Sequence, residues 1–116
     1  MEKRTVEMAL LLDFYGELLT KKQREYLDLY YNEDFSLTEI AKLGGITPQG
    51  VRDVIQRGGA ILQDVEAKTG LLARFGQVSN TAEGIRKKLA LLEAQGRDPA
   101  LAPLFQEIYH DLETLE

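Results

Sequence analysis

Apolar side chains recur every three or four residues along most of this chain, which is the spacing that gathers them on one side of an α-helix. The first such segment covers residues 5–19. Thr20 and Gln23 then have the spacing of a capping box, which begins a second helix that extends to about Tyr31. Every later segment with a clear pattern also has the helical period. The sequence therefore predicts an all-α fold.

The next two predicted helices form a pair joined by a tight turn. A capping box of Ser36 and Glu39 begins the third helix, which ends at Gly44-Gly45. The fourth begins at Thr47-Pro48, where the hydroxyl caps the helix and proline takes the first helical position. Small and apolar residues stand at the intervals that a helix-turn-helix requires: Ile40, Ala41, Gly45, Ile46, Val51 and Val54. Because this motif places its second helix in the major groove of DNA, we predict a recognition helix at about residues 48–57.

The apolar pattern of the fourth helix continues past the recognition helix. A stripe in steps of three and four runs to residue 72, and its main members are Val51, Ile55, Gly58, Leu62, Val65 and Leu72. An unbroken helix from 48 to 74 would be about 40 Å long. Gly58-Gly59 weakens it, so either the helix kinks there or Gly58 lets another helix approach closely. The stripe is either the seam of a homodimer, which would pair two recognition helices, or the core of a bundle.

Two further helices are predicted in the last third of the chain. Asn80 begins a segment with a helix-start signal, and Gly96 closes the helix that follows. Asp98-Pro99 opens the last helix. We therefore expect a helix-turn-helix domain over residues 1–75 and a two-helix C-terminal extension over residues 76–116.

The outward positions of the helix pair carry side chains that nucleic-acid-binding proteins use. They are Lys42, Thr47, Gln49, Arg52, Asp53, Gln56 and Arg57. Arginine can bind guanine and glutamine can bind adenine through two hydrogen bonds, and N–H groups at a helix start can hold a phosphate. The whole chain has a formal net charge of −5, which disfavours non-specific coating of nucleic acid. These residues are either a small basic reading surface on an acidic protein or a solvated helix face.

The composition argues against catalysis, metal binding and a membrane span. The chain has no cysteine and one histidine, His110, with no nucleophile or second base beside it in the sequence. We predict no catalytic residues, no metal site, no cofactor and no enzyme activity. No apolar run approaches the roughly 20 residues that cross a bilayer, and the N-terminus lacks a secretory signal, so we expect a cytoplasmic protein with no membrane partner.

Aromatic residues concentrate in the first third of the chain: Phe14, Tyr15, Tyr26, Tyr30, Tyr31 and Phe35. They are either a stacking platform for single-stranded RNA or a half-buried core with hydroxyls at the surface. We favour the core interpretation, because tyrosines at helical spacing usually pack inward.

The run LLDFYGELLTKKQREYLDLYYNEDFSLTEIA, residues 11–41, resembles the YlxM family of small bacterial proteins encoded beside components of the signal recognition particle. Residues 18–62 also resemble region 4 of bacterial sigma factors. The YlxM resemblance covers about the first 75 residues. At Gly50 this chain departs from the alanine that is typical of the family, and at Gly58-Gly59 it departs from an uninterrupted helix.

The resemblance implies a regulatory helix-turn-helix protein of the signal recognition particle pathway. The RNA of the particle or its GTPase protein would then be the partner. Two alternatives stay open: a dimeric transcriptional regulator that binds duplex DNA, and a protein–protein adaptor that keeps the helix-turn-helix only as a scaffold.

Overall fold

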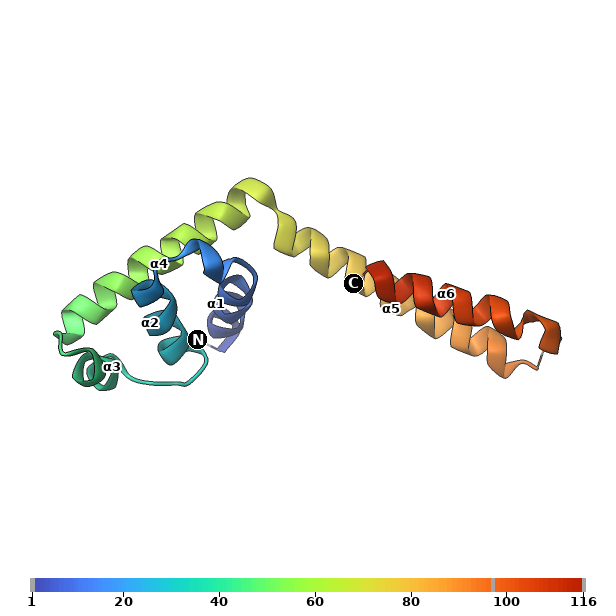
Figure 1. Ribbon diagram of the computed structural model, residues 1–116, viewed down its shortest axis with the longest axis horizontal. Helices are drawn as coiled ribbons and strands as arrows, with labels where there is room; N and C mark the ends of the chain where they lie inside the picture. The colour runs from blue at the N-terminus through green and yellow to red at the C-terminus, as the bar shows by residue number, and fades with distance from the viewer. Residues whose placement is uncertain (1, 97, 116) are drawn as a thin grey trace. The chain divides into compact units, whose positions relative to one another are not determined.

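The computed structural model describes residues 2–96 and 98–115, and in those ranges the chain forms helices and turns with no strand (Figure 1). The elements are α1 (Glu2–Tyr15), η1 (Gly16–Leu18), α2 (Lys21–Tyr31), α3 (Leu37–Gly44), α4 (Pro48–Thr69), α5 (Leu71–Ala94), η2 (Pro99–Leu101) and α6 (Ala102–Leu115). The predicted all-α fold is confirmed. The chain forms two compact units, Met1–Gly70 and Leu71–Glu116, which we call unit 1 and unit 2.

In unit 1 the helix α4 packs against α1, α2 and α3 (Figure 1). The side chains with less than a tenth of their surface exposed form one core. They are Met8, Leu11, Leu12, Tyr15, Leu19, Tyr26, Leu27, Ile40, Ala41, Val51, Ile55 and Leu62. Most of them stand at the helical spacing that the sequence shows, so periodicity alone indicates which face of each helix is buried.

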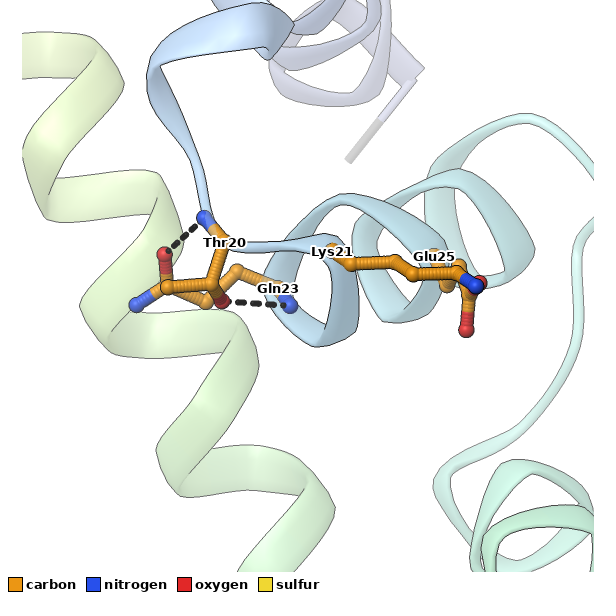
Figure 2. A network of polar contacts seen from close by, with 4 residues as sticks. All are labelled: Thr20, Lys21, Gln23 and Glu25. Carbon is orange, nitrogen blue, oxygen red and sulfur yellow. Dashed lines mark hydrogen bonds and ion pairs between the residues drawn. The ribbon is translucent and has the colours of Figure 1, made fainter.

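Side chains cap the starts of α2, α3 and α4, where backbone N–H groups have no partner within the helix. At α2 the Thr20 hydroxyl oxygen accepts a hydrogen bond from the Gln23 N–H at 3.2 Å, and the Gln23 side chain accepts one from the Thr20 N–H at 3.1 Å (Figure 2). Ser36 and Glu39 make the same reciprocal pair at α3. Both predicted capping boxes are confirmed.

The helix α4 runs through Gly58 and Gly59 without interruption. A Cβ atom added at Gly58 would lie 2.8 Å from Leu27 Cδ1, closer than two carbon atoms can stand. Gly58 therefore permits α2 to approach α4 closely, which was one of the two alternatives that the sequence left open.

The predicted end of α4 was wrong. The helix stops at Thr69, because Gly70 adopts a left-handed conformation (φ 62°) and its N–H bonds the Glu66 carbonyl oxygen at 2.8 Å. Leu72 therefore belongs to α5 and not to the long α4 stripe. The chain divides between Gly70 and Leu71, whereas we predicted the division at residue 75.

The predicted start of the next helix was also wrong. The helix α5 begins at Leu71, so Asn80 lies inside it. Asparagine in a helix interior costs at most about 0.7 kcal/mol relative to alanine, and the apolar stripe of α5 already continues across this position. A residue type that favours helix starts did not outweigh that stripe.

Unit 2 is a hairpin in which α5 and α6 run antiparallel, side by side (Figure 1). Three side chains are buried between them: Ala82, Phe105 and Leu112. The Tyr109 hydroxyl donates a hydrogen bond of 2.6 Å to Glu93 Oε1. Gly96 has a positive φ of 64° in the connection, and Asp98 Oδ1 accepts from the Ala100 N–H at 2.9 Å.

Candidate nucleic-acid interface

The turn between α3 and α4 has the backbone geometry of a helix-turn-helix. Gly45 follows α3 with φ 66° and ψ 30°, a left-handed conformation that glycine adopts without a steric penalty. The N–H groups of Gly45 and Ile46 both bond the Ala41 carbonyl oxygen, the latter at 3.2 Å. The chain thus reverses direction at the residue that the sequence indicated.

The start of the recognition helix is held by its cap and by its core residues. The Thr47 hydroxyl oxygen accepts a hydrogen bond of 3.0 Å from the Gly50 N–H, and Pro48 occupies the first turn. Ile40 on α3 and Val51 on α4 are fully buried. Because both helices are anchored by buried side chains, the direction in which α4 presents its outer face is fixed.

Neighbouring structure supports this helix pair in a way the sequence did not reveal. The buried ring of Tyr26 on α2 lies against Gly44, and a Cβ added at Gly44 would overlap the Tyr26 hydroxyl. Lys22 Nζ lies 5.7 Å from the centre of the same ring, within range of a cation–π interaction. Glycine at position 44 therefore serves packing, whereas glycine at position 45 serves backbone conformation.

All seven predicted interface residues are exposed: Lys42, Thr47, Gln49, Arg52, Asp53, Gln56 and Arg57. Lys42 lies in the last turn of α3, and the others follow the first three turns of α4 or its cap. The structure brings Gln49 and Asp53 together, since Gln49 Nε2 donates a 3.2 Å hydrogen bond to Asp53 Oδ1. A base that binds the Gln49 amide would have to displace this contact.

The two arginines of α4 have a different environment from Gln49. Neither the Arg52 nor the Arg57 side chain forms an ion pair or hydrogen bond with any residue that the structure describes. Arg52 follows Gln49 by three residues and precedes Gln56 by four, so these side chains share one face of the helix. Two guanidinium groups are thus available to phosphate or to base edges, with one carboxylate beside them.

The residues predicted as a dimer or bundle seam divide between the two units. Val51, Ile55, Gly58 and Leu62 are buried in unit 1, and Val65 is half-buried. Leu72 lies in α5. The first four positions of the stripe therefore contribute to the core of one chain.

The first turn of α3 contains a carboxyl group, that of Glu39, whose pKa is clearly shifted. Hydrogen bonds from the Ser36 backbone N–H, and then from its side chain, lower the pKa of Glu39 below its ordinary value of 4.5. The nearby positive charge of Lys42 acts in the same direction. The lowered pKa favours the ionised form of Glu39, which caps the start of α3.

The six aromatic residues differ in their exposure, and Phe14 is the most exposed of them at 42%. Tyr15 and Tyr26 are buried, and the Tyr15 hydroxyl donates a 2.5 Å hydrogen bond to Glu66 Oε1 near the end of α4. Half-buried aromatic rings line a cleft of about 780 Å³ that periodicity alone did not reveal. Its walls are Thr5, Val6, Tyr30, Tyr31, Asp34, Phe35, Ser36 and Glu39. The cleft lies between α1 and the segment that connects α2 to α3.

Residues 2–96 and 98–115 contain neither a candidate metal site nor a candidate membrane span. No group of three or more histidine, cysteine, aspartate or glutamate side chains is arranged to hold a metal ion there. None of the described helices combines the length and the apolar content needed to cross a bilayer.

A glycine turn, a capped second helix and an exposed polar face define a helix-turn-helix protein. The family model described as "Putative helix-turn-helix protein, YlxM / p13 like" matches residues 1–99. The chain belongs to this family, UPF0122, so the resemblance found in the sequence is confirmed.

Relatives match the chain over nearly its whole length. It is 41% identical over 108 residues to the UPF0122 protein of Thermoanaerobacter sp. (strain X514), covering 93% of this chain and 92% of the relative. The UPF0122 protein of Acetivibrio thermocellus is 43% identical over 112 residues, covering 97% and 96%. The UPF0122 protein BH2485 of Halalkalibacterium halodurans is 39% identical over 116 residues, covering all of both chains. The similarity therefore includes the hairpin of unit 2 as well as the helix-turn-helix.

Proposed function

We propose that this chain is a non-enzymatic, cytoplasmic regulatory protein that binds duplex DNA through α4. One observation carries the proposal: Ile40 and Ala41 of α3 and Val51 and Ile55 of α4 are buried, while the seven polar residues predicted for the interface are exposed. A capped helix that presents arginine and glutamine on one face is suited to the major groove.

The small number of positive charges on this face implies binding that depends on base contacts more than on phosphate contacts. Lys42, Arg52 and Arg57 are the three cations of the predicted interface, and Asp53 opposes close approach of a phosphate. Three cations limit the slope of log K against log salt to about −3 per protomer, which is shallow for a DNA-binding protein. Contacts to bases, rather than phosphate neutralisation, would then supply most of the affinity for a preferred sequence.

A regulatory role in the signal recognition particle pathway is what the family resemblance implies. The partner there would be the RNA of the particle or its GTPase protein. The exposed face of α4 supports duplex DNA over double-stranded RNA, because A-form RNA has a deep, narrow major groove that side chains do not read.

The test is selection of preferred sites from a pool of random duplexes, followed by fluorescence-anisotropy titration at two salt concentrations. Arg52→Ala should cost about 1–3 kcal/mol on the selected site and relax the preference at one base pair. Lys42→Ala should weaken all sequences alike and reduce the salt slope by about 1. Lys87→Ala on α5 is the matched control, and it should bind as the unaltered chain does.

Two outcomes would overturn the proposal. If no site is selected, or if Arg52→Ala binds the selected site as tightly as the control, α4 is not a reading helix.

Tight binding of signal recognition particle RNA that survives excess duplex DNA would move the function to that pathway. Capture of the particle's GTPase by the Arg52→Ala and Lys42→Ala variants as well as by the unaltered chain would favour the adaptor.

A further inference from the structure

Unit 2 leaves a large part of its apolar surface uncovered. On α5, Val78, Ile85 and Leu92 are seven residues apart and therefore share one face. On α6, Ile108 and Leu115 are seven residues apart and Leu104 stands four residues before Ile108, so these three also share one face. None of these six side chains is among the three that the hairpin buries.

The two stripes meet on one side of the hairpin. Val78 and Ile85 from α5 and Leu115 from α6 line a single groove of about 420 Å³. Its remaining walls are Arg74, Gln77, Thr81 and Ala82. We call the six stripe residues with this groove the hairpin face.

The exposed area of the hairpin face is large for so small a unit. Ile85, Leu92, Leu104 and Leu115 are between 38% and 58% exposed. Together with the half-buried Val78 and Ile108 they leave on the order of 400 Å² of apolar surface, against roughly 800 Å² of total surface per partner in a standard interface. Monomeric proteins seldom expose a contiguous apolar patch larger than a few hundred Å².

The charges of the two helices identify what fits this face. On α5, Arg74 lines the groove and Lys88 borders the stripe, so the charges beside the hairpin face are basic. In α6 the charged side chains are Glu107, Asp111 and Glu113, and there is no lysine or arginine. A second hairpin placed with its α6 against α5 would bring basic residues opposite acidic ones twice, as a two-fold interface requires.

We infer that the hairpin face binds the hairpin face of a second copy of this chain, so that two α5–α6 hairpins form a four-helix bundle. The heptad spacing of both stripes is the pattern that such bundles use. The α4 stripe, which the sequence left open as a dimer seam or a bundle core, contributes its first four positions to the core of one chain, so the seam inferred here lies on α5 and α6.

The experiment is sedimentation velocity of the full chain at about 1–100 µM without nucleic acid, since the expected mass is twice 13.1 kDa. Leu92→Glu places a carboxylate in the hairpin face and should weaken the dimer at least tenfold. The matched control is Leu91→Glu, which makes the same change at the preceding residue. Leu91 lies about 100° around the helix from Leu92 and is 66% exposed. This control should remain dimeric, and circular dichroism should show equal helix content in both variants.

A second pair of variants tests the charge argument. Lys88 is four residues before Leu92 and borders the stripe, whereas Lys87 points away from it. Lys88→Glu should weaken the dimer several-fold, and Lys87→Glu should leave it unchanged. An unaltered chain that is monomeric at 100 µM would overturn the inference, as would a dimer that Leu92→Glu leaves intact. The inference does not rest on DNA binding, so either can fail alone.

Discussion

Two pairs of glycines, one in α4 and one in α5, show how differently the two units of this protein are built. In α4, a Cβ at Gly58 would strike Leu27, and one at Gly59 would lie 3.2 Å from Met8 Cε. In α5, no atom beyond the helix's own backbone lies within 4 Å of the place where a Cβ would stand at Gly76 or Gly84. The same residue type thus permits close packing in unit 1 and serves no packing in unit 2.

The cores of the two units differ in the same way. Unit 1 buries a dozen apolar side chains among four helices, whereas the hairpin of unit 2 buries three. Side chains also cap three helix starts in unit 1. Unit 1 therefore has the contacts of a self-sufficient domain, and unit 2 has the apolar surface of half a bundle.

The largest expected effect is at Gly58, where the comparison predicts that alanine destabilises unit 1. Overpacking against the fully buried Leu27 costs about 1–3 kcal/mol, and the higher helix propensity of alanine returns up to about 1 kcal/mol. The net loss should be about 1–2 kcal/mol, a fall in Tm of roughly 5–15 °C. Near-UV circular dichroism is the measurement, because four of the five tyrosines lie in unit 1.

Gly59→Ala is the matched control for this variant. Its Cβ would meet only the end of the flexible Met8 side chain, which can move aside. We expect the stability to change by less than about 0.5 kcal/mol. Equal effects of the two substitutions would mean that helix propensity, and not the approach of α2, decides the requirement at this glycine pair.

The sequence indicated most of unit 1 because the signals there are local. The capping box at Thr20 and the turn at Gly45 depend on residues within a few positions of one another, and both form as predicted. The outward positions of α4 also follow from the helical period, although their ligand stays a prediction. The Gln49–Asp53 hydrogen bond could have been proposed from its four-residue spacing.

The features that the sequence left open or missed depend mostly on tertiary contacts. Gly58-Gly59 was compatible with a kink or with close approach of another helix, and α4 continues there because α2 packs against it; Gly70 ends the helix instead. The Tyr26–Gly44 contact and the aromatic cleft of unit 1 join segments distant in the chain, and no spacing rule reveals them. In the hairpin face, Val78 was missed because the predicted helix began at Asn80, nine residues after Leu71, the first residue of α5.

A smaller effect of the opposite sign is expected in unit 2. Gly84→Ala should stabilise α5 by about 0.5–1 kcal/mol, because alanine is the better helix former and nothing stands near its Cβ. Amide hydrogen exchange along α5 is the measurement, with Gly76→Ala as a second open position. A loss of protection at both positions would show that another surface covers these glycines in solution.

The smallest expected effect concerns the side-chain caps, which begin three helices of unit 1. Because the Ser36 N–H and hydroxyl lower the pKa of Glu39 when the protein is folded, the ionised carboxylate contributes stability above pH 4.5. This contribution should disappear as the pH falls through the lowered folded value. An NMR titration should give Glu39 a pKa below 4.5 in the intact chain and closer to 4.5 in Ser36→Ala.

Glu39→Gln keeps an oxygen acceptor for the cap but removes the titration, so its Tm should depend less on pH in this window. A Glu39 pKa at or above 4.5 would show that water replaces the cap in solution, and the contrast between the two units would then rest on packing alone.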